Sequence, residues 1–343
     1  MSITENVSLK HLNTFGVEAK ARYFCQVDTH IILREALNFR RTNSLDCLVL
    51  GGGSNVLLTS DYDGLVLHNS LRGIRIERAA DNKMLVTAAG GENWHQFVKY
   101  CLEHHCYGLE NLALIPGNVG AAPIQNIGAY GCEVADFIRF VRVEDIYSGN
   151  IDVLTPSDCQ FSYRDSVFKN ELAGKKIILE VGFELLSEPE INLSYPALKQ
   201  YFADKSLRPE PEQVFKAVCD IRSSKLPDPK VLGNAGSFFK NPVITKAQYD
   251  ALISKHPNMP SYQLEQGEVK VPAAWLIDQA GLKGLSVGDA QVHDKQALVI
   301  VNKGQASAED ITNLAKQVMH EVRARYDIAL ELEVQWIPSA DVE

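Results

Sequence analysis

The first 105 residues alternate short hydrophobic runs with two amphipathic segments. The runs are rich in β-branched residues and are separated by Gly, Asn and Asp, a pattern typical of strands joined by turns. Strands are predicted over 21–27, 47–50, 64–68, 74–78 and 84–88. Apolar residues recur at helical spacing over 30–41 and 93–104, which predicts two helices. The chain therefore opens as a mixed α+β structure.

The rest of the chain continues this mixture. Strands are predicted over 140–145, 176–185, 297–302 and 329–336. Prolines make 187–211 typical of turns, and a helix is predicted over 212–222, beside a domain boundary at about residue 215. Ser307 and Asp310 form a near capping box before an apolar-periodic run from Ile311 to Val322. This run predicts a helix with one buried face, packed on the neighbouring strands.

The segment 108–131 fits neither a helix nor a strand. It is too apolar for a solvated linker, and it contains too many Gly and Pro residues for a helix. We expect an ordered loop held by the surrounding scaffold, which is the kind of segment that carries binding residues.

Composition and charge narrow the functional classes. The chain has 343 residues, 45% hydrophobic and 22% charged, which is typical of a globular protein with two or three domains. The net charge of −9 argues against a nucleic-acid or anionic-membrane partner, because both attract positive surfaces. No apolar run has the length of a membrane span, and the N-terminal residues lack a signal-peptide pattern. We therefore expect a cytoplasmic protein.

The cysteines indicate neither a disulfide framework nor a metal site. Seven of them, an odd number, are spread from Cys25 to Cys219, which fits reduced thiols in the cytosol. His104, His105 and Cys106 have no distant Cys or His cluster to complete a zinc tetrahedron. No bound metal is expected.

Two Gly-rich loops are the candidate phosphate-binding elements. LGGGSNVLL at 50–58 follows a predicted strand, and such a turn can point backbone N–H groups at an anion. It is neither a dinucleotide fingerprint nor a P-loop, because Val56 begins a strand-like run and no Gly-Lys-Ser/Thr is present. A plain Gly-rich turn is the alternative for this motif alone. PGNVGAAPIQNIGAYG at 116–131 adds small residues and the amides of Gln125 and Asn126, so a large phosphate-bearing ligand between the loops is predicted.

Motifs along nearly the whole chain resemble those of the UDP-N-acetylenolpyruvoylglucosamine reductase (MurB) family. The motifs are HLNTFG at 11–16, GGGSNVLL at 51–58, PGNVGAAPIQNIGAYG at 116–131, FSYRDSVFK at 161–169, KLPDPK at 225–230, GNAGSFFKNP at 233–242, WLIDQAGLKG at 275–284 and LEVQW at 332–336. Any one of them could arise by chance, whereas all of them in this order could hardly do so. Asn118 departs from the pattern, since relatives tend to carry a smaller residue there.

The resemblance implies an α+β fold with non-covalent FAD and with NADPH as co-substrate. Two subdomains, 1–70 and 71–215, would form a vanillyl-alcohol-oxidase-type (PCMH-like) FAD-binding fold, and 216–343 would form an α+β substrate-binding domain. A substrate loop near 190–200, with NLSYPAL at 192–198, would place the chain in the variant that carries a tyrosine over the substrate. We also expect a monomer.

The resemblance assigns cofactor binding to the two Gly-rich loops. The implied residues are Gly51, Gly52, Gly53, Ser54, Asn55, Pro116, Gly117, Gly120, Ala121, Gln125, Asn126, Gly128, Ala129 and Tyr130.

The implied reaction is the reduction of UDP-N-acetylglucosamine enolpyruvate to UDP-N-acetylmuramate for peptidoglycan. The double bond needs a hydride, which flavin N5 would supply, and a proton on the carbon next to the carboxylate. By resemblance Ser237 is the proton donor, Arg164 grips the carboxylate through two hydrogen bonds, and Glu333 donates to the developing enolate as a protonated carboxyl.

Each of these three residues also has a structural interpretation. Ser237 could be a turn or cap residue, and Arg164 could form a surface ion pair with Asp165. Glu333 alternates with Glu331 in a predicted strand, so both could lie on one solvent-exposed face. Without the surrounding motifs, these interpretations would be preferred.

Substrate binding is assigned by resemblance to residues outside the flavin loops. Lys225 and Asn241 would be ligands of the diphosphate and of the nicotinamide end of the pocket, and Tyr195 would close over the phosphates. Gln296 would help to bind the substrate from the opposite wall of the pocket. Tyr163 is also assigned to substrate binding.

Two other functions compete with this one. A flavin oxidase on the same fold would pass its electrons to oxygen or another acceptor, and Ser237, Arg164 and Glu333 would then have no shared task. A non-enzymatic flavin or sugar-nucleotide sensor would bind tightly without NADPH turnover.

Overall fold

The computed structural model describes residues 3–203, 208–264 and 267–338, and these residues form two compact units. Unit 1 takes its residues from the segments Met1–Val7, Ala21–Gly53 and Tyr62–Ser224, and unit 2 from Ser8–Lys20, Ser54–Asp61 and Lys225–Glu343. The first Gly-rich loop is thus divided between the units after Gly53. The three-part division into 1–70, 71–215 and 216–343 stays a prediction.

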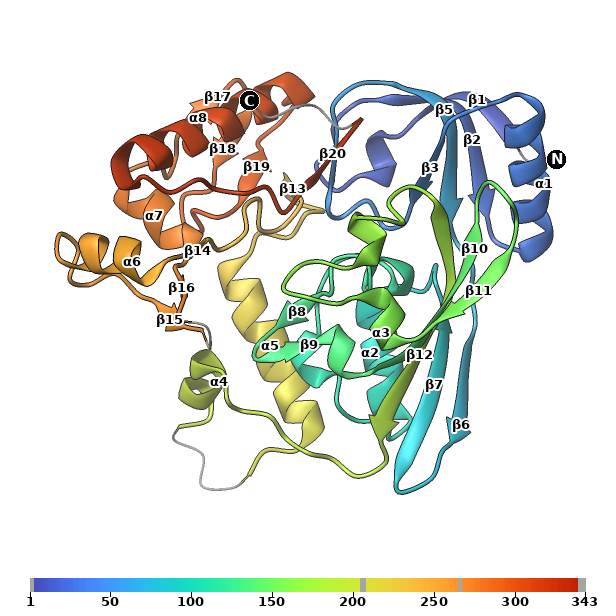
Figure 1. Ribbon diagram of the computed structural model, residues 1–343, viewed down its shortest axis with the longest axis horizontal. Coiled ribbons are helices and arrows are strands. Elements are labelled where there is room, and N and C mark those ends of the chain that lie inside the picture. Colours follow the sequence, from blue (N-terminus) through green and yellow to red (C-terminus); the bar gives the residue numbers. More distant parts are fainter. Residues whose placement is uncertain (1–2, 204–207, 265–266, 339–343) are drawn as a thin grey trace. The chain divides into compact units, whose positions relative to one another are not determined.

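Unit 1 contains two main sheets. The four-stranded sheet has the order β1-β2-β5-β3, and β5 pairs in parallel with both β2 and β3. Its strands are β1 (Ile3–Ser8), β2 (Lys20–Val27), β3 (Cys47–Leu50) and β5 (Tyr62–Asn69). The five-stranded sheet is antiparallel with the order β11-β10-β12-β7-β6 (Figure 1). Its strands are β6 (Ile74–Arg78), β7 (Lys83–Ala89), β10 (Ile138–Asp145), β11 (Ile151–Leu154) and β12 (Lys176–Leu186).

Helices and short strands complete unit 1. They are α1 (His30–Thr42), α2 (Trp94–Glu103), α3 (Pro156–Cys159), α4 (Pro196–Tyr201), α5 (Pro211–Lys225), β8 (Gly128–Ala129) and β9 (Cys132–Glu133). The helix α1 begins where the Thr29 hydroxyl accepts a hydrogen bond from Ile32 N. It buries Leu33, Ala36 and Leu37 in a cluster with side chains of β2 and β5. The helices predicted over 30–41, 93–104 and 212–222 are confirmed.

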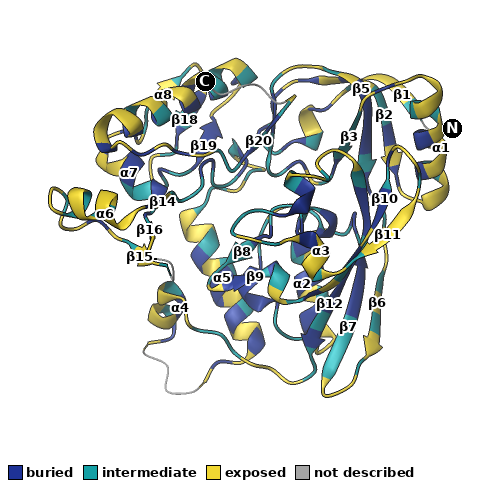
Figure 2. Cartoon of the chain, viewed as in Figure 1, coloured by how far each residue is buried: buried dark blue, intermediate teal, exposed yellow. Residues whose placement is uncertain are grey.

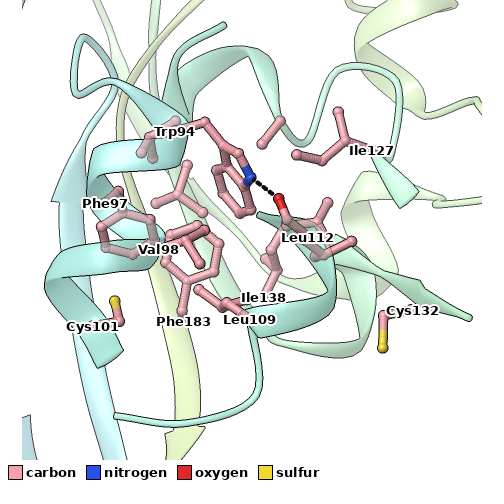
Figure 3. Close-up of a cluster of buried hydrophobic side chains, with 14 of the residues drawn as sticks. Trp94, Phe97, Val98, Cys101, Leu109, Leu112, Ile127, Cys132, Ile138 and Phe183 are labelled. Carbon is pink, nitrogen blue, oxygen red and sulfur yellow. Dashed lines mark hydrogen bonds between the residues drawn. The ribbon is translucent and has the colours of Figure 1, made fainter. Parts of the chain in front are cut away.

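The helix α2 supplies the core beside the second Gly-rich loop. Trp94, Phe97, Val98 and Cys101 are each 1% exposed. The rings of Trp94 and Phe97 lie 5.9 and 5.0 Å from that of Phe183 on β12, and the Trp94 indole Nε1 donates to the carbonyl of Leu112 at 2.8 Å (Figure 3). One tryptophan therefore joins the helix, the sheet and the start of the loop.

Unit 2 is built from short strands and three helices. Antiparallel sheets have the orders β13-β19-β18-β17 and β14-β16-β15, and β20 pairs in parallel with β4. The elements are β4 (Val56–Leu58), β13 (Gly233–Asn234), β14 (Val243–Ile244), α6 (Lys246–Ile253), β15 (Tyr262–Gln263), β16 (Val269–Lys270), α7 (Ala273–Gln279), β17 (Ser286–Val287), β18 (Ala290–Val292), β19 (Ile300–Asn302), α8 (Ala308–Tyr326) and β20 (Gln335–Ile337).

The predicted helix with one buried face is α8. Ser307 Oγ accepts from Asp310 N at 3.0 Å, and the Asp310 carboxylate accepts from Ser307 N at 2.8 Å, so the capping box is complete. The helix packs against β17, β18 and β19 through a buried stripe, and Figure 2 shows exposed residues along its other side. The stripe consists of Ile311, Leu314, Ala315, Val318, Val322 and Tyr326.

Two predictions near the C-terminal end were wrong in extent. The strand predicted over 329–336 is reduced to β20, and the one over 297–302 to β19. Glu331 and Glu333 do not alternate in a strand: the carbonyl of Glu331 accepts from Lys240 N, and Glu333 N donates to Phe238 O. The segment makes isolated backbone contacts with the loop after β13, which hydrophobic alternation does not reveal.

The Pro-rich stretch also differs from its prediction. It was interpreted as turns, yet α4 forms within it. Pro196 occupies the first helical position, where its missing N–H costs nothing. Residues 204–207 of the stretch lie outside the described residues.

Three further observations concern the described residues as a whole. None of their helices combines the length and the apolar character needed to span a membrane. No group of three or more His, Cys, Asp or Glu side chains among them could hold a metal ion. All seven cysteines are free.

We predict that Trp94→Phe lowers the free energy of unfolding by about 1–3 kcal/mol, because it leaves the buried Leu112 carbonyl without its donor. The matched control is Trp336→Phe, since the Trp336 Nε1 is also buried but has no hydrogen-bond partner among the described residues. Urea unfolding followed by circular dichroism measures both. Equal losses would contradict the role of the Trp94 hydrogen bond.

Candidate active site

The two Gly-rich loops come into backbone contact within unit 1. A Cβ built on Gly52 would lie 3.0 Å from Gly117 Cα and 3.1 Å from Asn118 Oδ1, which is tighter than nine in ten real Cβ contacts, so these neighbours would have to shift by a few tenths of an ångström. Gly51 faces the same loop at 3.9 Å from Ala121 Cβ. Glycine at position 52 permits this approach without a shift of the second loop.

The N-terminal turn of α2 carries the second loop. Trp94 N donates to Gly117 O at 3.0 Å, and Val119 N and Gly120 N donate to Glu92 O and Gly90 O at 2.8 Å each. A Cβ on Gly120 would lie 2.9 Å from Gly90 O. The loop is therefore fixed along several residues, and its small side chains are needed for the fit.

Sharp turns shape both loops for a phosphate-bearing ligand. Gly53 and Gly117 have positive φ angles of 59° and 112°, and the non-glycine residues Asn126 and Tyr130 have φ of 43° and 51°. Successive turns of this kind direct backbone N–H groups to one side and form anion-binding concavities. The two loops, which small residues bring into contact, therefore fit the diphosphate of a dinucleotide such as FAD.

Asn126 holds the second loop to two neighbouring segments. It is 1% exposed, and its Nδ2 donates to the Glu133 carboxylate at 2.7 Å and to Ser162 O at 3.0 Å. Its Oδ1 accepts from Ala135 N at 3.1 Å. Because each polar atom of this buried amide is bonded, the side chain fixes the loop rather than leaving it mobile.

Arg164 lies next to this loop. Its Nη2 donates to Gly128 O at 2.7 Å, and its guanidinium carbon lies 5.4 Å from the centre of the Tyr163 ring. The residue has φ of 56°, a left-handed conformation that side chains rarely adopt. Strain of this kind is typical of residues that are placed for a function. The neighbouring carboxylate of Asp165 accepts from Asn170 Nδ2 at 3.1 Å.

Tyr195 packs on the same loop. It precedes α4 and meets the Tyr130 ring edge-on at 5.2 Å between centroids, with 37% of its surface exposed. Asn111 Nδ2 donates both to Tyr130 O at 2.9 Å and to Asn192 O at 3.0 Å, which ties the two segments together. Burial raises the pKa of the Tyr130 hydroxyl. Unit 1 thus brings together Arg164, Tyr195, Tyr163 and the second Gly-rich loop.

Unit 2 brings the segments of Ser237 and Glu333 together. Gly236 has φ of 72°, and its N–H donates to Oδ1 of the buried Asn234 at 2.9 Å, so the chain turns just before Ser237. Glu333 N then donates to Phe238 O at 2.9 Å. Ser237 and Glu333 are both half-buried.

Asn55, assigned to the flavin by resemblance, also holds Glu333. Its Nδ2 donates to Glu333 O at 3.1 Å, and its carbonyl accepts from Gln335 N at 3.0 Å. The end of the first Gly-rich loop therefore fixes the backbone of the candidate catalytic glutamate. The Gly-Gly-Gly-Ser-Asn sequence by itself does not reveal these bonds to the segment of Glu333.

The other assigned residues of unit 2 occupy separate positions. Asn241 Oδ1 accepts from Ala273 N at 3.0 Å, which fixes the residue at the start of α7. Gln296 lies in a turn, where its N–H donates to His293 Nδ1 at 3.1 Å and its carbonyl accepts from Val299 N. Lys225 is exposed at the end of α5.

Comparison with known proteins assigns the family. The FAD binding domain family matches residues 21–153, and the C-terminal domain of UDP-N-acetylenolpyruvoylglucosamine reductase matches residues 228–337. A UDP-N-acetylenolpyruvoylglucosamine reductase of Chromobacterium violaceum is 49% identical over 330 residues, covering 96% of this chain and 97% of the relative. One from Shewanella sediminis is 46% identical, covering 97% and 96%. The chain belongs to the UDP-N-acetylenolpyruvoylglucosamine reductase family.

Solved structures agree with this assignment. The crystal structure of UDP-N-acetylenolpyruvylglucosamine reductase (MurB) from Thermus caldophilus is 27% identical, with a TM-score of 0.66, and the match covers 97% of this chain and 98% of that one. A solvent-stable cholesterol oxidase shares the fold at 13% identity and a TM-score of 0.50, covering 96% and 86%. The predicted α+β fold of the vanillyl-alcohol-oxidase type, with its FAD-binding domain, is confirmed.

Several residues that build the site of this reductase escaped the sequence-based analysis. Trp94 and His95, in the first turn of α2, bind Leu112 and Leu114 just before the second Gly-rich loop, and Arg222 of α5 also binds Leu114. Their positions give no motif signal, because each lies on a helix whose periodicity is explained by packing. His95 stacks on Phe215, which lies on α5 seven residues before Arg222. Local sequence does not predict this contact, because it depends on the tertiary structure.

We predict that Gly52→Ala weakens FAD binding, because its Cβ would push the backbone of Gly117 out of its present position. Overpacking of about 1–3 kcal/mol corresponds to roughly 5- to 150-fold in affinity. Fluorescence titration of the apoprotein with FAD measures the change. Gly174→Ala is the control: it strains a left-handed turn with no atom within 4 Å, and should leave the affinity unchanged. Unchanged affinity in Gly52→Ala would contradict the close approach of the loops.

Proposed function

We propose that this chain uses NADPH and bound FAD to reduce UDP-N-acetylglucosamine enolpyruvate to UDP-N-acetylmuramate, a step of peptidoglycan precursor synthesis. The observation that carries the proposal is near-full-length identity of 45–49% to reductases of this name. The FAD binding domain and the C-terminal reductase domain both match, so the chain has the parts for the cofactor and for the sugar-nucleotide reaction.

The protein must orient the substrate and manage one proton. When bound, FAD would supply the hydride that the terminal carbon of the enolpyruvyl group requires, and NADPH would be the source of that hydride. Negative charge then develops on the enolpyruvyl carboxylate, and the neighbouring carbon must receive a proton. Three side chains meet these needs in the proposal.

Ser237 is the proposed proton donor. The turn at Gly236 and the buried Asn234 hold its backbone, and the segment pairs with that of Glu333. A hydroxyl is a weak acid, so a neighbouring donor that stabilises the enolate is required. Glu333, with its carboxyl protonated, supplies that hydrogen bond, and Asn55 fixes the backbone of this residue.

Arg164 is the proposed carboxylate ligand. A guanidinium presents five N–H donors in one plane and matches a carboxylate with two of them. The bond from Nη2 to Gly128 O orients that plane, and the left-handed backbone aims the side chain. The arginine side chain is therefore pre-positioned for a carboxylate.

The remaining assigned residues bind the substrate in this proposal. Tyr195 closes over the diphosphate, Lys225 neutralises it, and Tyr163, Asn241 and Gln296 complete the pocket. The packing of Tyr195 on Tyr130 supports its place beside the cofactor loop, and the exposure of Lys225 fits a residue that meets a charged ligand. We also propose a cytoplasmic location, in agreement with the seven free thiols. The monomeric state stays a prediction.

An oxidase or a sensor explains the sequence less completely. The fold alone would allow an oxidase, because a cholesterol oxidase shares it. Reductases at 45–49% identity match over nearly the whole chain, including the C-terminal domain, and this favours the reductase.

We predict that Ser237→Ala slows flavin reoxidation by the enolpyruvyl sugar about 10²- to 10⁴-fold, the usual contribution of a general acid. Flavin reduction by NADPH should keep its normal rate. Anaerobic stopped-flow absorbance resolves the two half reactions. Ser254→Ala, at the exposed residue that follows α6, is the matched control and should behave as the unmodified protein. Normal reoxidation in Ser237→Ala would show that another group supplies the proton.

We predict that Arg164→Lys impairs the enolpyruvate half reaction much more than the NADPH half reaction, because an ammonium group cannot bind the carboxylate with two planar hydrogen bonds. Arg139→Lys, on an exposed position of β10, is the control for the change of cation. The same stopped-flow measurement applies. Equal loss in both half reactions would count against carboxylate binding by Arg164.

A further inference from the structure

Leu114, just before the second Gly-rich loop, has an unfavourable backbone conformation. Its φ is 57°, in the left-handed region, although it is neither Gly, Asn nor Asp. Two residues later the loop begins at Pro116. A free chain would leave this conformation, so the surrounding structure must impose it.

Side chains from two helices hold both polar groups of Leu114. Its N–H donates to His95 Nδ1 at 3.0 Å, and its carbonyl accepts from Arg222 Nε at 3.2 Å. His95 is the second residue of α2, and Arg222 lies near the end of α5. The bonds from Trp94 to Leu112 O and Gly117 O hold the chain on either side.

The imidazole of His95 is itself fixed. It stacks on Phe215 of α5 with 5.3 Å between ring centroids and 11° between the planes. Phe215 and Arg222 are seven residues apart, so they share a face of α5. The two helices thus converge on one residue of the chain.

Only the neutral form of His95 can make this bond. An N–H group donates to Nδ1, so Nδ1 must carry a lone pair and the ring proton must lie on Nε2. Protonation of Nδ1 would set two N–H groups against each other.

We infer that His95 is a positioning residue for the flavin: its neutral imidazole holds Leu114 in the left-handed conformation and so presets the second Gly-rich loop for FAD. This inference rests on the flavin site proposed above. Arg222 is the partner that holds the carbonyl. Neither side chain needs to contact the cofactor for this role.

The charges around His95 favour the neutral form. Burial is the main cause that lowers the pKa of the imidazole from its ordinary value of 6.5, and the positive charges of Lys99 on α2 and Arg222 on α5 lower it further. When the loop is released, the pKa returns toward the ordinary value. FAD affinity is therefore at its maximum above about pH 6.5, the ordinary pKa. It falls as the pH drops from there to the lowered pKa of His95, and below that pKa it falls no further.

Titration of the apoprotein with FAD from about pH 5 to about pH 8 tests the inference. His95→Phe keeps a ring on Phe215 but has no acceptor, so it should bind FAD on the order of tenfold more weakly at neutral pH. His95→Asn places an amide oxygen where Nδ1 lies and does not titrate. At neutral pH this variant should bind FAD nearly as tightly as the unmodified protein does. Its FAD affinity should not fall as the pH is lowered.

Two results would overturn the inference. The first is His95→Phe binding FAD as tightly as the unmodified protein. The second is His95→Asn retaining the full acid decline, which would assign the decline to another group such as His68. Thermal unfolding of each variant checks that the fold is intact. If His95→Phe does not fold, the pH dependence of FAD binding in His95→Asn decides the question. Because binding rather than turnover is measured, the test is independent of the assigned reaction.

Discussion

The close approach of two backbones, at Gly52 and Gly117, is the constraint on which the flavin site depends. A single methyl group at position 52 would lie 3.0 Å from Gly117 Cα, so the observed spacing of the loops could not be kept without a shift of one of them. The surrounding elements maintain this approach. Trp94 and the two residues Gly90 and Glu92 just before α2 bind the second loop through backbone hydrogen bonds, and the buried amide of Asn126, within the loop, binds Glu133, Ser162 and Ala135.

The same supports connect the cofactor loops to the candidate catalytic residues. In unit 1 the carbonyl of Gly128 orients the guanidinium of Arg164, and Tyr130 packs against Tyr195. In unit 2 Asn55, at the end of the first loop, holds the backbone of Glu333, which in turn pairs with the segment of Ser237. Each loop therefore contacts residues that the proposed function assigns to the substrate: Arg164 and Tyr195 for the second loop, and Glu333 for the first.

Local patterns predicted much of the fold. The helices α1, α2 and α8 follow from apolar spacing and capping residues, and the strands around the Gly-rich loops follow from β-branched runs. The predicted strand over 329–336 was too long, because its first half pairs only locally with the loop after β13. The helix α4 was missed because four prolines between 189 and 211 dominated the pattern. In the site, motifs indicated the loops, whereas Trp94, His95 and Arg222 depend on long-range packing that no local pattern encodes.

The most direct measurement of the central claim is an anaerobic two-step reduction. The protein with bound FAD is mixed with one equivalent of NADPH, and the absorbance of oxidised flavin is followed until it is lost. UDP-N-acetylglucosamine enolpyruvate is then added. The proposed function predicts rapid return of the oxidised spectrum with formation of UDP-N-acetylmuramate. A flavin that stays reduced with this sugar nucleotide, and is reoxidised only when air is admitted, would contradict it.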